Sequence, residues 1–256
     1  MDKAQSHTAL DIRHLSVGYS EKVVAQDINA TLERGTLTCL IGPNGAGKST
    51  LLRTLCAFQS PIDGHIIIYT DTRAEDLTTL SKMRVAKTIG VVLTDITDVG
   101  NITAWEVVAL GRSPYTDFRG RLTDADRRIV DDSMAMAGIA NLSNRKMRRL
   151  SDGERQKVMI AKALAQQTPL MVLDEPTAFL DYPGKVDTLR LLRRMTREHG
   201  ITVLMSTHDI EPAMQAADNI WYMNGGRDIV AGTPDEMLRS GVLDGFVTPR
   251  SPAACR

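Results

Sequence analysis

The chain has 256 residues, enough for one large or two small domains with a substantial core. Its 31 basic and 31 acidic residues cancel, so no net field attracts the whole protein to nucleic acid or to an anionic membrane. No apolar run approaches the roughly 18 residues that span a bilayer, the N-terminus is polar, and the spacing of the three cysteines indicates neither a disulfide framework nor a metal motif, so we expect a soluble cytosolic protein.

The first part of the chain is rich in predicted strands. Residues 10–15 and 28–32 alternate between apolar and polar side chains, as strands with one buried face do. Residues 37–41 form a short apolar run that predicts a buried strand. Residues 66–69 and 89–93 predict two further strands.

A phosphate-binding loop follows the strand at 37–41 and leads into a segment of helical character at 50–55. Nine consecutive residues fit the pattern G-x-x-x-x-G-K-[ST] without a mismatch: Gly42, Pro43, Asn44, Gly45, Ala46, Gly47, Lys48, Ser49 and Thr50. Gly45 and Gly47 allow positive φ, which turns backbone N–H groups inward around an anion. Lys48 supplies a positive charge to the outer phosphates, and the Ser49 hydroxyl can bind Mg²⁺. Because a strand and a helix flank the motif, we prefer a nucleoside triphosphate site to a plain Gly-rich turn.

The middle of the chain is helical in pattern. Residues 105–110 open a helix, and residues 124–138 predict a second one that Gly138 ends. Ser151 and Glu154 have the spacing of a capping box in front of the apolar-patterned helix 157–165. Residues 104–149 therefore look like an all-α insertion in an α/β core.

Strands and helices alternate again after this block. Residues 170–173, 201–205 and 220–223 predict strands, and 184–199 and 211–217 predict helices. This alternation indicates a mostly parallel sheet with helices on both faces.

Two carboxylates follow the apolar strand at 170–173, where ligands bind in parallel sheets. Asp174 is placed to bind Mg²⁺, directly or through water. Glu175 could polarise the water that attacks the terminal phosphate. Two acids after an apolar run are more often a plain strand-to-loop transition, but the phosphate-binding loop favours phosphoryl transfer to water.

The order of these motifs, from the phosphate-binding loop through residues 150–156 and 170–175 to His208, resembles the ATP-binding-cassette (ABC) ATPases from about residue 10 to 240. The resemblance implies an α/β fold with a P-loop NTPase (RecA-like) core and a mostly parallel sheet, an N-terminal antiparallel β subdomain and an inserted α-helical subdomain. It further implies one domain over 1–256, with the core and β subdomain at about 1–93 and 154–247, the helical subdomain at about 94–153 and a loose tail at 248–256.

The resemblance also implies roles for single residues. Tyr19 matches the aromatic residue that stacks on adenine, and Lys48, Ser49 and Thr50 match the residues that bind phosphate and Mg²⁺. Asp174 and Glu175 match the Mg²⁺-linked acid and the catalytic base, and His208 matches the histidine that contacts the γ-phosphate. The residues implied to contact the nucleotide across a head-to-tail homodimer are Ser151, Gly153, Glu154 and Asp181.

Two positions depart from the family pattern. Thr94 stands where the family has a Gln that contacts Mg²⁺ and the attacking water. Thr94 could act through a bridging water, or the following Asp95 could take part, and both alternatives stay open. Asp152 stands where the signature loop has a Gly, and we expect its carboxylate to point away from the γ-phosphate, which would otherwise be repelled.

Residues 107–115 and 120–123, together with 173–182, are similar to the importer ATPases for iron–siderophore complexes, haem and cobalamin. The resemblance implies an ATPase that uses ATP and Mg²⁺ and works as a homodimer with two integral membrane permease subunits. A periplasmic or surface substrate-binding protein would deliver the cargo. Such a protein would be cytoplasmic, would lie on the inner face of the cell membrane and would bind no nucleic acid. The alternative is a soluble ABC ATPase switch with a nucleic-acid or cytosolic assembly partner.

Overall fold

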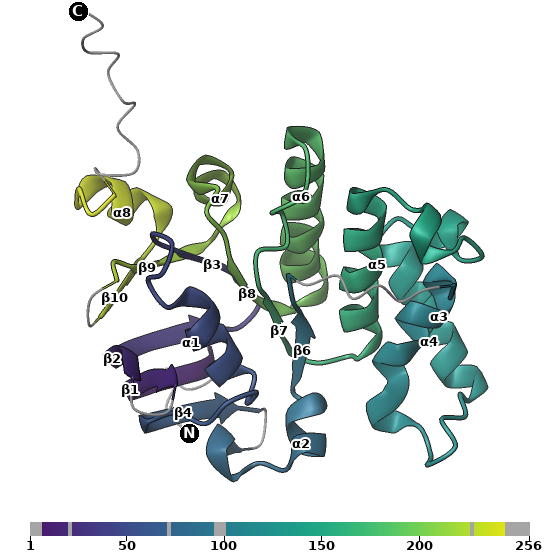
Figure 1. The fold of residues 1–256 in the computed structure, drawn as a ribbon, viewed down its shortest axis with the longest axis horizontal. Helices are drawn as coiled ribbons and strands as arrows, with labels where there is room; N and C mark the ends of the chain where they lie inside the picture. Colours follow the sequence, from purple (N-terminus) through teal and green to yellow (C-terminus); the bar gives the residue numbers. More distant parts are fainter. Residues whose placement is uncertain (1–6, 20–21, 71–72, 95–100, 226–227, 244–256) are drawn as a thin grey trace, which may run out of the picture.

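Two β-sheets organise the chain in this computed structural model, which describes residues 7–19, 22–70, 73–94, 101–225 and 228–243. The smaller sheet is antiparallel and has the strand order β2-β1-β4-β5. Its strands are β1 (Thr8–Tyr19), β2 (Lys22–Glu33), β4 (Asp63–Tyr69) and β5 (Ala74–Asp76). This sheet is the expected N-terminal β layer, and it lies below the first helix of the core in Figure 1.

The larger sheet has six strands in the order β10-β9-β3-β8-β7-β6. The run from β9 to β6 is parallel, and β10 pairs antiparallel with β9. Its strands are β3 (Leu37–Ile41), β6 (Ile89–Val92), β7 (Leu170–Leu173), β8 (Thr202–Ser206), β9 (Asn219–Met223) and β10 (Ile229–Gly232). The predicted mostly parallel sheet is confirmed, and β3 and β7 have the predicted bounds, while β5 and β10 were not predicted.

Helices cover the larger sheet and extend beyond its β6 edge. The helices are α1 (Lys48–Leu55), α2 (Lys82–Ala86), α3 (Ala104–Ala109), α4 (Asp124–Met136), α5 (Asp152–Ala165), α6 (Tyr182–His199), α7 (Ile210–Ala216) and α8 (Pro234–Arg239). The insertion predicted at 104–149 contains α3 and α4, and α5, which was expected to belong to the core, packs against both of them at the right of Figure 1. Its exact subdomain limits stay a prediction. None of the helices in the described part of the chain is long and apolar enough to cross a membrane.

Most differences from the predicted helix ends are small. α1 begins at Lys48 and α6 at Tyr182, in each case two residues before the predicted start. Gly138 has φ of +72° and follows the cap residue of α4, so it ends that helix as a left-handed glycine. The predicted tail at 248–256 lies outside the described residues.

The parallel strands separate two hydrophobic cores. In β3, Cys39 and Ile41 face one core and Leu40 faces the other, because successive side chains of a strand point to opposite faces. The same alternation holds in β7 and β8. Burial on both faces explains why these strands are continuous apolar runs in the sequence.

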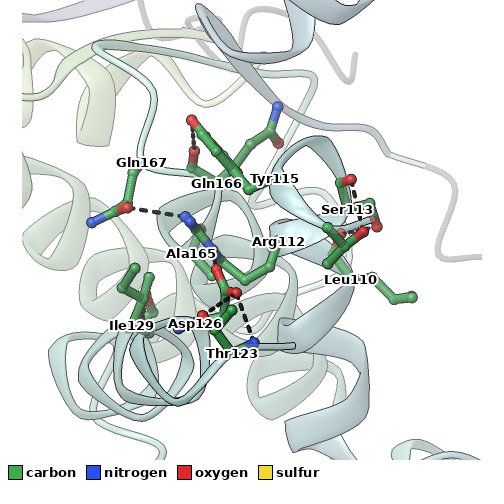
Figure 2. A network of polar contacts seen from close by, with 12 residues as sticks. Leu110, Arg112, Ser113, Tyr115, Thr123, Asp126, Ile129, Ala165, Gln166 and Gln167 are labelled. Atoms are coloured by element: carbon green, nitrogen blue, oxygen red, sulfur yellow. Dashed lines mark hydrogen bonds and ion pairs between the residues drawn. The ribbon is translucent and has the colours of Figure 1, made fainter. Parts of the chain in front are cut away.

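A buried polar network holds the helical block together. Arg112, only 5% exposed, lies on the short 3₁₀ turn Leu110–Tyr115 that continues α3. Its Nε donates to Oδ1 of Asp126 on α4 at 2.9 Å, and its Nη1 donates to the carbonyl oxygen of Ala165 at the end of α5 at 2.8 Å. Figure 2 shows the guanidinium between these partners, with the ring of Tyr115 at 4.1 Å. One cation thus joins three elements of the insertion.

Candidate nucleotide-binding site

The phosphate-binding loop connects β3 to α1 and has the predicted backbone. Gly45 and Gly47 have φ of +81° and +103°, in the left-handed region that favours glycine. Gly42 has φ of +153°, and a Cβ atom on it would lie 2.1 Å from the carbonyl oxygen of Met223. A side chain at Gly42 would therefore push the loop away from β9.

Lys48 is the first residue of α1 and is 6% exposed. Its Nζ donates to the carbonyl oxygens of Gly42 at 2.8 Å and Pro43 at 3.0 Å, so the ammonium group lies against the backbone at the start of the loop. Burial lowers the pKa of Lys48, while the carboxylates of Glu175 and Asp174 act in the opposite direction. The helix N-terminus and the ammonium group together form a positive site for an anion.

Asp174 follows β7 and is nearly buried, with 9% of its surface exposed. Its Oδ1 accepts a hydrogen bond from Ser206 Oγ at 2.7 Å and one from Ser49 Oγ at 3.3 Å. The structure therefore brings together Ser49 and Asp174, two of the residues that the sequence indicated for Mg²⁺. Ser206, the last residue of β8, was not predicted as part of the site, although a polar residue at the carboxyl end of an apolar strand is a usable signal.

Glu175 has φ of +47°, an uncommon value for a residue with a side chain. Its backbone N–H donates to Ser206 Oγ at 2.8 Å, and its carbonyl oxygen accepts from the N–H of Ala178 at 3.1 Å. Its Oε2 lies 3.4 Å from Nδ1 of His208, the residue two positions after β8. Strained backbone that neighbours hold in place is typical of functional sites, and here it carries the candidate catalytic carboxylate.

Thr94 lies just after β6 and contacts the same region. Its hydroxyl donates to the carbonyl oxygen of Asp174 at 2.8 Å. The hydroxyl hydrogen is therefore used, whereas the oxygen keeps lone pairs. Asp95, the alternative partner considered from the sequence, lies outside the described residues.

The first turn of α5 carries the signature residues. The predicted capping box is confirmed, because Ser151 Oγ accepts from the N–H of Glu154 at 3.3 Å and the Glu154 carboxylate accepts from the N–H of Ser151 at 2.8 Å. Asp152 pairs with Arg155 of the same helix at 3.2 Å. Gly153 lies beside Leu180 in the loop after Glu175. Figure 1 separates α5 from α1 by β6, β7 and α6, so these residues do not share the phosphate-binding loop of their own chain.

The two remaining candidates lie at element ends. Tyr19 ends β1 and is 49% exposed, and its hydroxyl oxygen accepts from Thr50 Oγ1 at 3.4 Å. Asp181 caps α6, and its Oδ1 accepts from the N–H of Gly184 at 3.0 Å. Tyr19 is thus available for stacking at the edge of the loop, while Asp181 has a structural role as a cap.

The geometry joins three functions at the carboxyl ends of β3, β6, β7 and β8. It contains a cradle for phosphate, two oxygen donors suited to a hard divalent cation, and a fixed carboxylate beside an imidazole. Ligands bind at this edge of open α/β sheets. Such a set can bind a nucleoside triphosphate and transfer its terminal phosphoryl group to water.

Comparison with known proteins supports a site that binds and hydrolyses a nucleoside triphosphate. The ABC transporter family matches residues 25–178, more than half of the chain. An uncharacterised ABC transporter ATP-binding protein of Methanocaldococcus jannaschii is 40% identical over 92% of this chain and 80% of its own length. A ferric enterobactin transport ATP-binding protein of Escherichia coli is 35% identical over 90% of this chain and 83% of its own length. A bacterial ABC transporter cassette solved as a dimer is similar with a TM-score of 0.73 and 26% identity, over 88% of this chain and 98% of its own.

The fold, the nucleotide site and the extent of these matches have one explanation. The chain belongs to the ABC transporter family, as one of its ATP-hydrolysing cassettes.

Proposed function

We propose that the chain is the ATPase subunit of an importer for an iron–siderophore complex, with haem and cobalamin as alternative cargoes. One observation carries the proposal. The phosphate-binding loop, the Ser49–Asp174 pair and the Glu175–His208 pair lie together at one edge of the sheet, where they can bind and cleave ATP. The E. coli relative, which is named for ferric enterobactin transport, supports the cargo class.

In the proposed reaction, ATP binds with its phosphates around the N-terminus of α1 and its adenine against Tyr19. The Nζ of Lys48 leaves its backbone acceptors and contacts the outer phosphates. A water molecule attacks the γ-phosphorus while Glu175 accepts its proton, and the bond to the leaving oxygen of ADP breaks. His208, 3.4 Å from Glu175, contacts a γ-phosphate oxygen.

The residues present fit Mg²⁺, which is the usual partner of ATP. Ser49 and Asp174 offer hard oxygen ligands 3.3 Å apart, and among the described residues no cluster of three His, Cys, Asp or Glu side chains competes for a metal. Mg²⁺ typically takes one or two protein ligands and completes its shell with phosphates and water. When bound, it would neutralise charge on the transferred phosphoryl group. The Thr94 oxygen is proposed as a further ligand through a bridging water.

Two copies are proposed to face each other head to tail, so that Ser151 and Gly153 of one copy contact the ATP held by Lys48 of the other. The separation of α5 from α1 within one chain supports this, because the signature loop needs a partner to reach a phosphate. The similarity to a cassette solved as a dimer supports it as well. ATP must then bind the closed dimer more tightly than the open one by a few kcal/mol.

Asp152 is expected to have little effect on nucleotide binding, because its carboxylate turns back to Arg155 and is 57% exposed. Asp152→Gly should change the dissociation constant for ATP by less than about tenfold. Asp124→Gly is the matched control, because Asp124 is exposed and also follows the cap residue of its helix. Both variants should be compared with the wild-type protein by equilibrium binding of a labelled ATP analogue. A tighter binding by tenfold or more in Asp152→Gly alone would show that this carboxylate repels the γ-phosphate.

The permease is proposed to bind in an apolar groove of about 820 Å³ between the end of α1, β6 and α5. Apolar side chains from all parts of the groove line it: Phe58, Leu80, Val85, Val91, Leu93 and Met159. The groove adjoins both the phosphate-binding helix and the signature helix, so an occupant could sense their relative position. Phe58 in the groove and Met83 on α2 are more than half exposed, so they add apolar surface next to the groove that a protein partner can cover.

A membrane pull-down tests this partner. A tagged wild-type protein should retain a polytopic membrane protein from detergent-solubilised membranes of the source organism. Phe58→Glu should lose most of that recovery while it keeps ATP affinity. Leu238→Glu on α8 is the matched control, since Leu238 is 50% exposed and Phe58 57% exposed. Equal recovery with both variants would remove the groove from the proposal, and recovery of cytosolic proteins or nucleic acid alone would favour a soluble ATPase switch.

Uptake measurements test the cargo. A strain without the gene should lose uptake of radioactive iron supplied as a siderophore complex, and the wild-type gene should restore it. Uptake of labelled haem and labelled cobalamin in the same strains is the comparison. Restoration of only one of these would reassign the cargo.

A further inference from the structure

A buried side-chain amide without a partner lies near the proposed catalytic carboxylate. Gln156 is on α5, and only 7% of its surface is exposed. Its Nε2 has no hydrogen-bond partner among the residues that the structure describes. Buried polar groups are nearly always hydrogen-bonded, because a donor that leaves water without gaining an acceptor destabilises the fold. The amide therefore indicates a bound group that accepts a hydrogen bond.

Gln156 lines a small hollow that also reaches Glu175. The other lining residues come from the start of α5, from the segment after β6 and from the loop after β7: Asp152, Thr94, Pro176, Ala178, Phe179 and Leu180. The space for the centre of a water-sized molecule is about 10 Å³. That is about the space that a single water molecule needs, provided that two to four polar groups surround it.

Apart from Asp152, whose carboxylate pairs with Arg155, the polar groups around the hollow match the hydrogen-bonding capacity of one water. The Thr94 hydroxyl hydrogen is used by the Asp174 carbonyl oxygen, so at the hollow Thr94 can only accept. The carboxylate of Glu175 is an acceptor, whereas the Gln156 amide group is a donor. A water molecule can accept from Gln156 and donate to Glu175.

We propose that the hollow holds one water molecule between Nε2 of Gln156 and the carboxylate of Glu175, and that Gln156 is a positioning residue for ATP hydrolysis. This inference rests on the proposed role of Glu175 in the reaction. The water donates a hydrogen bond to the same carboxylate whose Oε2 lies 3.4 Å from Nδ1 of His208. Gln156 does not touch the nucleotide and acts through this water.

The position of Gln156 connects the two ATP sites of the proposed dimer. Ser151 and Gly153, in the first turn of α5, would contact the ATP of the partner, and Gln156 is on the same rigid helix. A shift of α5 on binding that ATP would move the amide relative to Glu175. Hydrolysis at one site would then depend on occupancy of the other, which is positive cooperativity in the rate.

Gln156→Met tests the donor, because methionine has a similar length, fills the space and donates no hydrogen bond. We expect the maximal hydrolysis rate to fall about tenfold, the loss expected for a hydrogen bond to a charged group. The Hill coefficient for ATP should fall towards one. Binding of a non-hydrolysable analogue should change by less than twofold, and the Tm should change little because methionine fills the same space.

Gln215→Met on α7 is the matched control, since Gln215 is exposed and Arg193 donates to its backbone oxygen, which the substitution keeps. Wild-type rate and Hill coefficient in Gln156→Met would overturn the inference, because the amide would then only fill space. A tenfold loss of analogue affinity would overturn it as well, because Gln156 would then act in binding.

Gln156→Glu provides a second test if the methionine variant folds poorly. The glutamate has the same shape but is an acceptor at neutral pH, so it should show the same loss of rate and cooperativity. Wild-type kinetics in this variant would contradict the inference. Glu175→Gln in the same assay keeps the two proposals apart: an active Glu175→Gln protein refutes the role of Glu175, whereas an inactive one beside a fully active Gln156→Met protein refutes only the water link.

Discussion

Glu175→Gln will lower the rate of ATP hydrolysis by about 10²- to 10⁴-fold, the usual contribution of a general base. The glutamine has the same size and keeps an oxygen that can accept a hydrogen bond, but it cannot take a proton from the attacking water. The backbone of residue 175 is held by Ser206 and Ala178, so the substitution should leave the loop in place. The expected defect is therefore in chemistry and not in folding.

The same variant should retain ATP and favour the dimer, because the closed dimer is expected to open only after ATP is hydrolysed. Size-exclusion chromatography with light scattering in saturating Mg-ATP should show a dimer for Glu175→Gln and a mixture or monomer for the wild-type protein. Single-turnover phosphate release gives the rate. Glu198→Gln on the exposed side of α6 is the control and should behave as wild type. A monomeric Glu175→Gln protein, or one that hydrolyses ATP at the wild-type rate, would contradict the prediction.

The parts of the site that could be predicted from the sequence are local. The phosphate-binding loop is a continuous motif, and its glycines impose the backbone by themselves, as the positive φ at Gly45 and Gly47 confirms. The capping box of Ser151 and Glu154 likewise needs only four consecutive residues. β3 and β7 are buried on both faces, so their apolar runs give their ends without any knowledge of neighbours.

Contacts set by strand register could not be predicted in this way. Leu173 of β7 lies opposite Met205 of β8, so the residues that follow, Asp174 and Ser206, become neighbours. Nothing near Ser206 in the sequence reveals that its hydroxyl will hold both Asp174 and the backbone of Glu175. The short strands β5 and β10 were missed for a related reason. They are edge strands of three and four residues, too short to show a period, and pairing with a single neighbouring strand defines them.

The partners of Arg112 in the helical block could not be predicted from the sequence either. The sequence placed it in a segment similar to importer ATPases, but its partners are 14 residues away on α4 and 53 residues away at the end of α5. Charged residues are mostly exposed, so the residue type alone favours a solvent-exposed position for Arg112. Only the packed structure shows a buried cation with three acceptors, the third being Oε1 of Gln167 at 3.0 Å.

Arg112→Leu should lower the free energy of unfolding by about 3–5 kcal/mol, the usual cost when one partner of a buried ion pair is removed. Leucine leaves the Asp126 carboxylate buried without its cation and the carbonyl oxygen of Ala165 without its donor. Urea unfolding followed by circular dichroism measures the change. Arg190→Leu is the matched control, since Arg190 also pairs with an aspartate, Asp187 at 3.8 Å, but is 77% exposed. The control should lose no more than about 1 kcal/mol.

A second substitution separates the charge from the packing. Asp126→Asn in the Arg112→Leu background removes the unpaired charge, and it should restore part of the lost stability because a neutral amide is less costly to bury than a carboxylate. Acid should destabilise the wild-type protein through the same carboxylate. Hydrogen bonds from Thr123, and then the Arg112 guanidinium, hold the pKa of Asp126 below its usual value in the folded protein. The stability that this group contributes is therefore present above the pKa of a free aspartate, about 3.9, and is lost as the pH falls below it. Wild-type protein should lose more stability between about pH 5 and pH 3 than the double variant does, and equal losses would mean that the Arg112–Asp126 pair does not stabilise the helical block.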